Sequence, residues 1–238
     1  MFSSLDPRNT DAGIPRLANE AAIYEQRQVS LRYGGLAAYT AYAKKLVWPD
    51  LNRQGARVLC LLNGFIGDPP EEVIQITRFS DLETWNGCQH TGAIVEDGLV
   101  VKEEVRVLKP IASRPKEFVP PEDRRAVYGF RRQLIRSSDV EEFANCSENG
   151  VWPRIESQGA CILVLWSTLA DTDPIEVILL TGYHGPGHWE ETRVTQPKPE
   201  GVDSALWQGD LELRKRREQI TLKTWVNLMQ AVEIAPHG

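Results

Sequence analysis

The sequence predicts an α+β protein made of two tandem ferredoxin-like modules, whose antiparallel sheets face each other in a pseudo-dimeric α/β barrel. Three observations lead to this prediction: a phrase that occurs twice, a register that holds around it, and one order of elements in both halves. The phrase Val-Trp-Pro, followed by Gln-Gly-Ala, begins at Val47 and again at Val151. Internal repetition of this kind indicates a duplicated structural unit.

The two copies keep the same offset, 104 positions, well beyond the phrase. Tyr24 and Arg27 match Tyr128 and Arg131, and Trp85 matches Trp189. A length of 238 residues fits two modules of about a hundred residues each. We expect an N-terminal arm, a first module, a linker with several prolines, a second module and a C-terminal tail, with the bounds 1–21, 22–110, 111–123, 124–230 and 231–238.

Each module shows the pattern of the βαββαβ unit. Strands are expected in the first module at 23–31, 56–65, 72–79 and 99–108, and in the second at 126–135, 161–166, 176–183 and 220–226. Helices follow the first strand and precede the last one in each module, and Pro49 either kinks its helix or begins a new turn. Such a sheet carries helices on one face only, so two copies can cover each other's open faces.

Composition excludes several classes of function. A net charge of −6 argues against a nucleic-acid-binding surface, and the basic run Arg214–Arg217, flanked by Glu212 and Glu218, is typical of a solvated helix face. No apolar run is long enough for a membrane span. The four cysteines show no CxxC spacing, and residues 1–22 resemble no targeting signal, so we expect a cytoplasmic protein without disulfides or zinc.

The first module resembles the NIPSNAP family of the dimeric α/β barrel superfamily. The resemblance rests on Tyr24–Arg27 opening a strand, on a helix that ends in Gly55, and on Glu72–Ile74 followed by Phe79. It implies this fold, a small organic ligand and a possible homodimer; superfamily members include cofactor-free oxygenases, isomerases, cyclases and haem enzymes. The histidine and tryptophan of the family's third strand are replaced here by Gln75 and Thr77, and in the second module by Leu179 and Thr181.

The repeat departs most sharply from itself after the third strand. Ser80–Trp85 in the first copy corresponds to His184-Gly185-Pro186-Gly187-His188-Trp189 in the second. We expect a shaped loop there rather than a regular helix, with His184 and His188 as the catalytic acid and base. The alternatives are a surface turn with solvated histidines, a metal set that adds Glu191, or haem bound through His188. We expect neither a metal nor a nucleotide cofactor.

Arg27 and Arg131 occupy equivalent points on the first strand of each module. We expect both to point into the cavity between the sheets and to hold a carboxylate or enolate. The alternative is an internal ion pair with Glu25, Glu72 or Glu176. Further substrate contacts are expected from polar and aromatic residues on or just after the third strands: Gln75, Thr77, Thr181, Tyr183 and Trp189.

These observations favour a small-molecule enzyme that performs isomerase, cyclase or lyase chemistry on a small organic or aromatic substrate. Two alternatives remain open: a non-catalytic NIPSNAP-like binding or interaction protein, and a cofactor-free or haem-dependent oxidoreductase. A polar-lined pocket between the sheets would favour an enzyme. A filled interior, with both arginines in ion pairs and both histidines in solvent, would favour the binding protein.

Overall fold

Eight antiparallel strands close into one barrel in this computed structural model, which describes residues 22–88, 98–115, 119–170, 172–193, 198, 200–234 and 236. The strand order around the barrel is β1-β3-β2-β8-β5-β7-β6-β4. The first module contributes β1 Ile23–Leu31, β2 Arg57–Ile66, β3 Glu72–Phe79 and β4 Val100–Pro110. The second contributes β5 Val127–Ile135, β6 Cys161–Thr168, β7 Ile175–Tyr183 and β8 Thr221–Ile234. The predicted tandem ferredoxin-like fold is confirmed.

Two seams join the modules into a barrel. β4 meets β6 over a short register from Leu108↔Thr168 to Pro110↔Trp166, and β2 meets β8 over a longer one that begins at Cys60↔Ile234. The strand β8 therefore continues to Ile234, through part of the segment expected as a tail. Its last residues are ordered as a strand because they pair with β2 and close the sheet.

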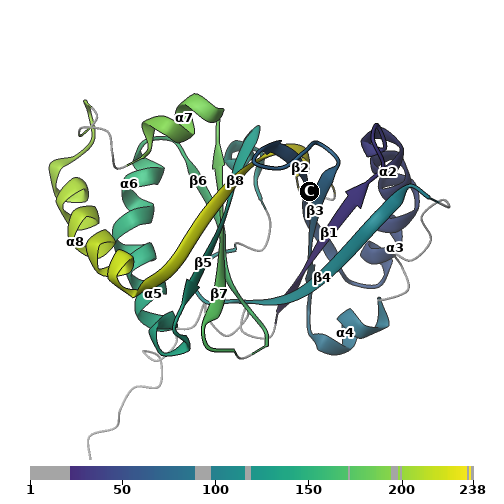
Figure 1. Cartoon of the computed structure of the whole chain (residues 1–238), viewed down its shortest axis with the longest axis horizontal. Coiled ribbons are helices and arrows are strands. Elements are labelled where there is room, and N and C mark those ends of the chain that lie inside the picture. Colours follow the sequence, from purple (N-terminus) through teal and green to yellow (C-terminus); the bar gives the residue numbers. More distant parts are fainter. Residues whose placement is uncertain are drawn as a thin grey trace, which may run out of the picture.

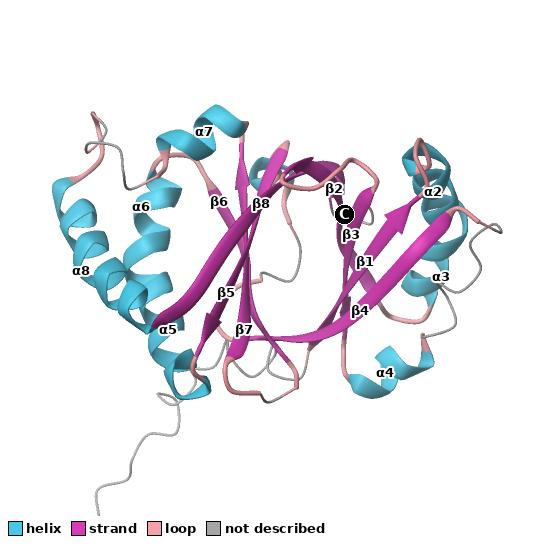
Figure 2. Ribbon diagram, in the orientation of Figure 1, coloured by secondary structure: helices cyan, strands magenta, loops and turns pink. Residues whose placement is uncertain are grey.

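The helices lie outside the barrel on two opposite sides, one set for each module (Figures 1 and 2). They are α2 Leu36–Tyr42, α3 Trp48–Arg53 and α4 Leu82–Gly87 in the first module, and α5 Val140–Cys146, α6 Trp152–Ser157, α7 Pro186–Glu191 and α8 Ser204–Ile220 in the second. Of these described helices, none has the length and apolarity that a membrane span requires.

Both Trp-Pro phrases follow a π-helical turn. The π-helical segments Ala43–Val47 and Ser147–Val151 lead directly into α3 and α6, so each proline stands in the first turn of a helix. Proline is tolerated there because it lacks only a donor that the first turn does not use. Gly55 and Gly159 follow these helices at φ of 86° and 90°, the left-handed conformation that glycine adopts without strain.

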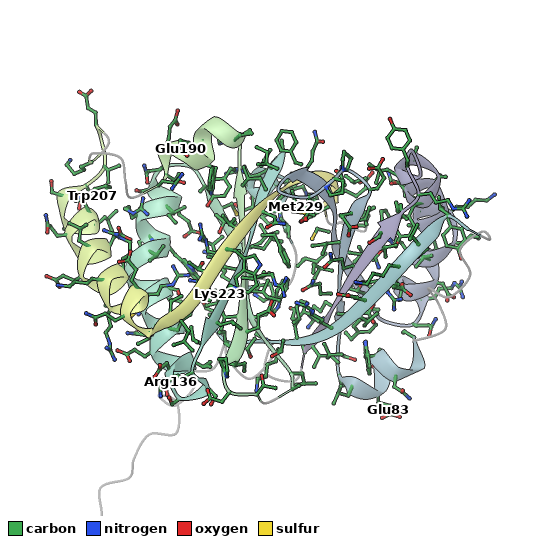
Figure 3. All side chains as sticks on the ribbon, in the orientation of Figure 1. Glu83, Arg136, Glu190, Trp207, Lys223 and Met229 are labelled. Carbon is green, nitrogen blue, oxygen red and sulfur yellow. The ribbon has the colours of Figure 1, made fainter. Side chains whose placement is uncertain are left out.

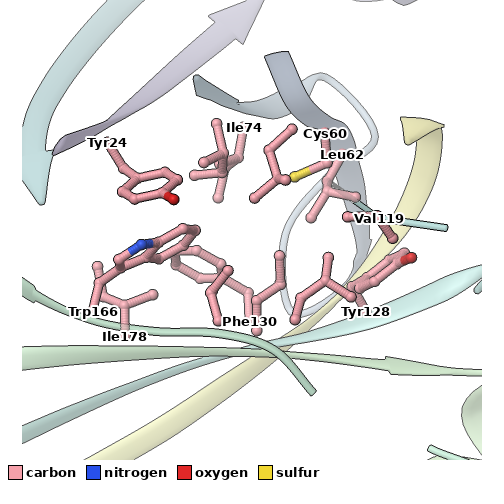
Figure 4. Close-up of a cluster of buried hydrophobic side chains, with 14 of the residues drawn as sticks. Tyr24, Cys60, Leu62, Ile74, Val119, Tyr128, Phe130, Trp166 and Ile178 are labelled. Carbon is pink, nitrogen blue, oxygen red and sulfur yellow. The ribbon is translucent and has the colours of Figure 1, made fainter. Parts of the chain in front are cut away.

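Hydrophobic side chains fill the space between the two sheets (Figure 4). Tyr24 and Trp166 meet there across the module boundary, with ring centroids 5.2 Å apart, and Phe130 and Tyr128 are buried beside them. This part of the barrel was expected to hold the substrate cavity. It is instead a packed core that holds the two modules together.

Arg27 and Arg131 lie on the outer faces of their sheets, not in the barrel. Side chains alternate along a strand, so Arg27 shares a face with Val29 and Leu31 rather than with Tyr24. Val29 and Leu31 pack beneath the helices of the first module, and Ile135 does the same on the face that carries Arg131. The predicted direction of both arginines was therefore wrong. Their predicted equivalence is correct.

Candidate functional site

A cavity of about 470 Å³ lies in the second module, between the outer face of its sheet and the helices that cover it. Strands β5, β7 and β8 form its floor, and α6, α7 and α8 contribute to its sides. Figure 3 shows Lys223, one of the lining residues, on β8 close to the end of α8. The cavity thus belongs to one module, and the barrel interior is a separate space.

The described wall of this cavity is strongly cationic. It carries the side chains of Arg131, Arg154, Arg193, Arg214, Arg217 and Lys223. The one acidic residue in that described wall is Glu218, which accepts a hydrogen bond of 3.1 Å from Arg214 Nη1. A concave site with an excess of one charge concentrates ligands of the opposite charge. The cavity is therefore built to attract an anion.

Arg131 lines the cavity without an acidic partner among the described residues. Its Nη1 donates to Thr224 Oγ1 at 3.3 Å. Burial lowers the pKa of Arg131, and the nearby positive charge of Arg193 lowers it further, against the opposing influence of Tyr183. A buried cation is costly unless an anion compensates it. An anionic ligand in the cavity would supply that compensation.

Arg27, the equivalent residue of the first module, is fully compensated. Its Nε lies 2.8 Å from Glu25 Oε1, and its Nη1 lies 2.5 Å from Glu103 Oε1. Burial by itself lowers the pKa of Arg27, but the two carboxylates outweigh it, so the pKa is raised. The space around this arginine is only about 20 Å³. The first module has the same framework but no room for a ligand.

Two replacements account for the difference between the modules. Gly129 stands where the first module has Glu25. Since Arg27 pairs with Val105 and Arg131 with Val226, Thr224 stands where the first module has Glu103. A Cβ added to Gly129 would lie 3.1 Å from Tyr183 Cε2, so the glycine leaves space beside Arg131 that any side chain would reduce. The second module therefore has neither acid, although it has the equivalent arginine, Arg131.

Arg217 is a second buried arginine in the wall, with 8% of its surface exposed. Its Nη2 donates to Gln133 Oε1 at 2.9 Å, and its guanidinium lies 4.5 Å from the ring centroid of Phe143. Its Nε has no hydrogen-bond partner in the described structure. Burial lowers the pKa of Arg217 to about 10, and the positive charge of Arg131 contributes to that shift.

Arg154 and Asp210 form a buried ion pair that connects the helices on the outer side of the cavity. Arg154 Nε lies 2.9 Å from Asp210 Oδ2, and both side chains are almost completely buried. Arg154 Nη1 also donates to the carbonyl oxygen of Thr192, just after α7. Burial raises the pKa of Asp210, although Arg154 and Arg214 pull it back down. The pair thus ties α6 to α8 and to the end of α7.

The basic run on α8 is divided between the cavity and the solvent. Arg214 and Arg217, three positions apart, line the cavity, whereas Lys215 and Arg216 are exposed. The interpretation of the whole run as a solvated helix face was therefore wrong for two of its four residues. Helical periodicity places Arg214 and Arg217 on one side of α8.

His188 lies within α7 and His184 just before it, and neither is in the described cavity wall. Segment Pro186–Glu191 forms α7, the counterpart of α4, because Gly185 stands at its N-cap and Pro186 begins its first turn. The expectation of an irregular loop was wrong. The backbone N–H of His184 donates to His188 Nδ1 at 3.1 Å. The proton of the His188 ring is therefore on its Nε2, which donates to the Gln158 carbonyl oxygen at 2.9 Å.

These bonds give His188 a structural function at the end of α6. The His184 ring stacks on that of His188 with centroids 5.0 Å apart, and Tyr183 meets His188 edge-on at 5.8 Å. Within the described ranges, no three potential ligands from histidine, cysteine, aspartate and glutamate come together. The set of His184, His188 and Glu191 therefore finds no support as a metal centre in this part of the chain.

The remaining predicted contacts divide between the modules. Thr181, Tyr183 and Trp189 line the large cavity together with Arg131. Gln75 lines the small space beside Arg27, where it accepts from Trp48 Nε1 at 2.8 Å. Thr77 is buried and accepts from Gln75 Nε2 at 3.1 Å. The first-module residues thus form hydrogen bonds with neighbouring side chains, whereas those of the second module line the large cavity.

No protein-family model matches the sequence, and no curated protein matches it. Solved structures of the same fold do match. A candidate monooxygenase from Lactobacillus acidophilus NCFM matches with a TM-score of 0.62 and 15% identity over 92% of this chain and 98% of that chain. A candidate monooxygenase from Fusobacterium nucleatum matches with a TM-score of 0.58 and 11% identity, over 92% of this chain and 95% of that chain. An anthrone oxidase-like protein matches with a TM-score of 0.57 and 8% identity, over 91% of this chain and 93% of that chain. These likenesses show a shared dimeric α/β barrel fold.

Proposed function

We propose that this chain is a small-molecule enzyme that binds an organic anion in the second-module cavity and oxidises it with dioxygen. One observation carries the proposal: Arg131 lines an open cavity without a described carboxylate, whereas Arg27, its equivalent, is held by Glu25 and Glu103. The duplication supplies an internal comparison. The second module has neither acid and has a cavity at the equivalent place.

The size and lining of the cavity suit an aromatic or enolic anion. Its volume falls within the range of roughly 300–1,000 Å³ that is usual for small-molecule sites. Tyr183, Trp189 and Leu179 supply aromatic and apolar surface, and the arginines supply charge. Guanidinium groups bind flat carboxylate and enolate oxygens through paired N–H donors.

The cations would promote ionisation of the ligand. A nearby positive charge lowers the pKa of an acid because it stabilises the conjugate base. Burial raises the pKa of Tyr183, with Arg131 opposing, so its hydroxyl stays protonated at neutral pH and can donate to the same oxyanion. Preorganised donors of this kind stabilise developing negative charge in an enzyme.

Oxidation of a stabilised anion suits this wall better than isomerase or lyase chemistry. Isomerisation or elimination at a weakly acidic carbon needs a positioned base, whereas a strongly activated methylene can lose its proton to solvent once its enolate is stabilised. In the described wall the one carboxylate is Glu218, bonded to Arg214, and neither His184 nor His188 lines the cavity. The similar structures, described as two candidate monooxygenases and an anthrone oxidase-like protein, also favour oxidation.

The proposed reaction balances without a cofactor. An activated methylene loses a proton to solvent, and its carbanion, held as an enolate, forms a C–O bond with dioxygen. The resulting peroxide anion takes a proton back from solvent, its second carbon-bound proton is lost as the O–O bond breaks, and the departing hydroxide takes up a proton to leave as water. The methylene becomes a carbonyl, and the four electrons removed from carbon reduce dioxygen. One oxygen atom ends in the carbonyl and the other in water.

Haem does not fit the described wall of this cavity. That wall contains no histidine, cysteine or methionine to serve as an axial ligand. Tyr183 is the remaining possibility, but the raised pKa of its hydroxyl disfavours the phenolate that would bind iron. The resemblance to the NIPSNAP family carries no activity into the proposal, because no family model matches the chain.

A homodimer is a separate proposal, supported by exposed apolar residues on the outside of β4. Val101 is 68% exposed and Val105 is 40% exposed. The barrel is closed within one chain, so a second copy would add an interface without completing the core. Sedimentation equilibrium tests this directly, and a monomer at all concentrations would overturn it.

Oxygen consumption with anthrone tests the proposed activity. Anthrone has an activated methylene that ionises to an aromatic enolate, and a heat-denatured sample corrects for its spontaneous oxidation. We expect wild-type protein to consume one dioxygen per anthrone and to convert the methylene into a second ketone. Arg131→Gln should lower kcat/KM by about 10- to 100-fold, the value of a lost charge-assisted hydrogen bond.

Arg216→Gln is the matched control, since Arg216 stands on α8 but is exposed and pairs with Glu142. It should leave the rate unchanged. Equal rates in wild type and Arg131→Gln would show that the site is wrong. Binding of anthrone to the wild type without oxygen uptake would instead favour the non-catalytic binding protein.

A further inference from the structure

We propose that the bound molecule presents two neighbouring oxygen groups, one to Arg131 and the other to Arg217. The corresponding ligand class comprises aromatic or enolic anions with oxygens on adjacent or alternate carbons, such as ortho-dicarboxylates, ortho-hydroxyaryl carboxylates and β-dicarbonyl enolates. This inference rests on the proposed function, because it assigns the second-module cavity as the binding site. It adds a second contact point and hence a selectivity.

The five arginines of the described wall fall into two groups. Three have carboxylates: Arg154 pairs with Asp210, Arg214 with Asp210 and Glu218, and Arg193 with Glu190. Arg131 and Arg217 have none among the described residues. The two arginines without a carboxylate are both associated with β5, since Arg131 stands on that strand and Arg217 donates to its Gln133. Two unmatched cations in one cavity call for two anionic or strongly accepting groups.

The hydrogen bonds of Arg217 leave it incompletely satisfied. Gln133 Oε1 accepts from Nη2, while Nε is buried without a partner in the described structure. Gln133 is itself a wall residue on β5, two positions from Arg131. The same strand therefore places Arg131 in the wall and anchors Arg217 beside it. A buried, unpaired N–H costs free energy, which a ligand oxygen could offset.

A purely structural arginine would look different. Phe143 provides cation–π contact to Arg217, with 4.5 Å between the guanidinium carbon and the ring centroid. That contact and one neutral amide do not replace an ion pair. Asp210 and Glu218 favour the charged form of Arg217 without pairing with it in the described structure, but burial and the positive charge of Arg131 outweigh them and lower its pKa. Removing a buried cation that lacks a counter-ion is often neutral or stabilising. A structural arginine with satisfied bonds would instead be costly to remove.

Calorimetric titration with phthalate and benzoate tests the two-point model. Phthalate has two adjacent carboxylates, and benzoate has one on the same ring. We expect the wild type to prefer phthalate by about 10-fold, the value of one additional charge-assisted contact. Arg217→Gln should remove that preference, because it weakens phthalate binding much more than benzoate binding. Arg131→Gln should weaken both ligands.

The outcomes separate this inference from the proposed function. If Arg131→Gln changes neither affinity, the cavity is not the binding site and both proposals fail. If Arg131→Gln weakens both ligands but Arg217→Gln keeps the phthalate preference, only the two-point model fails. The thermal midpoint of ligand-free Arg217→Gln supplies an independent readout. We expect it to equal or exceed that of the wild type, and a marked decrease would identify Arg217 as a structural residue and contradict the model.

Discussion

Arg131 donates to Thr224 Oγ1 at the position where Arg27 of the first module meets the carboxylate of Glu103. The two arginines share their strand position, their outward direction and their neighbours in the sheet register. They differ in the charge around them. The duplicated chain thus contains one module in which this arginine is neutralised internally and one in which an external anion can neutralise it.

Removal of Glu25 should destabilise the first module strongly. The Glu25 side chain is 4% exposed, and it accepts from both Arg27 and Trp85. Glu25→Gln leaves Arg27 buried with a weaker partner, so we expect the free energy of unfolding in urea to fall by about 3 kcal/mol. Glu103→Gln is the control, because Glu103 is 39% exposed and should contribute less than about 1 kcal/mol. Equal losses in the two variants would contradict the buried-pair account.

Phthalate affinity should fall at high pH. The pKa of Arg217 is lowered to about 10, mainly by burial, so the guanidinium loses its proton above that pH in the empty cavity. The second contact requires the charged form, so the dissociation constant should be flat below about pH 10 and rise above it by about tenfold in total, the value assigned to that contact. Titrations between about pH 8 and pH 11 would show this, and Arg217→Gln should lack that rise.

The same shift predicts the sign of the stability change in the ligand-free protein. The folded-state pKa of Arg217 lies below its ordinary value, so the unfolded chain binds the proton more tightly. Protonation therefore destabilises the fold below about pH 10, and this contribution disappears as pH rises above that value. Comparison with Arg217→Gln isolates it. If the wild type instead loses stability relative to Arg217→Gln as the pH rises above about 10, the lowered pKa of Arg217 is refuted.

His188 should matter for stability rather than for ligand binding. It accepts from the His184 N–H and donates to the Gln158 carbonyl, so His188→Ala removes two hydrogen bonds. We expect a loss of about 1–2 kcal/mol in the free energy of unfolding and benzoate affinity within about twofold of the wild type. His184→Ala keeps its backbone donor and should cost less. A large loss of turnover in His188→Ala at unchanged stability would restore the acid–base function predicted from sequence.

The architecture could be predicted because the repeat exposes it directly. Trp48 and Trp152 fix the offset, and the hydrophobic pattern supplies the βαββαβ order. The direction of the arginines also follows from the sequence, although it is opposite to the one we predicted. Tyr24 and Arg27 are three positions apart on one strand and must face opposite sides of the sheet. Because Tyr24 is in the barrel core, Arg27 belongs under the helices.

The site was only partly predictable. Arg131, Thr181, Tyr183 and Trp189 were identified, and the change from Glu25 to Gly129 was visible as a departure between copies. Its meaning depends on Thr224, whose equivalence to Glu103 comes from strand pairing and not from the repeat offset. Arg217 lies on α8, which has no counterpart of similar length among the described residues of the first module. Its burial is set by packing against Phe143 and Gln133.

The most direct test of the account introduces a carboxylate beside Arg131. Thr224→Glu places a carboxylate where the first module has Glu103, at an exposed position on the cavity wall beside Arg131. Thr224→Gln is the neutral control of the same length. Calorimetric titration with benzoate should give an affinity at least about tenfold weaker for Thr224→Glu and near wild type for Thr224→Gln. Equal benzoate affinity in the wild type and in both variants would contradict the claim that the unneutralised Arg131 makes the second module a binding site.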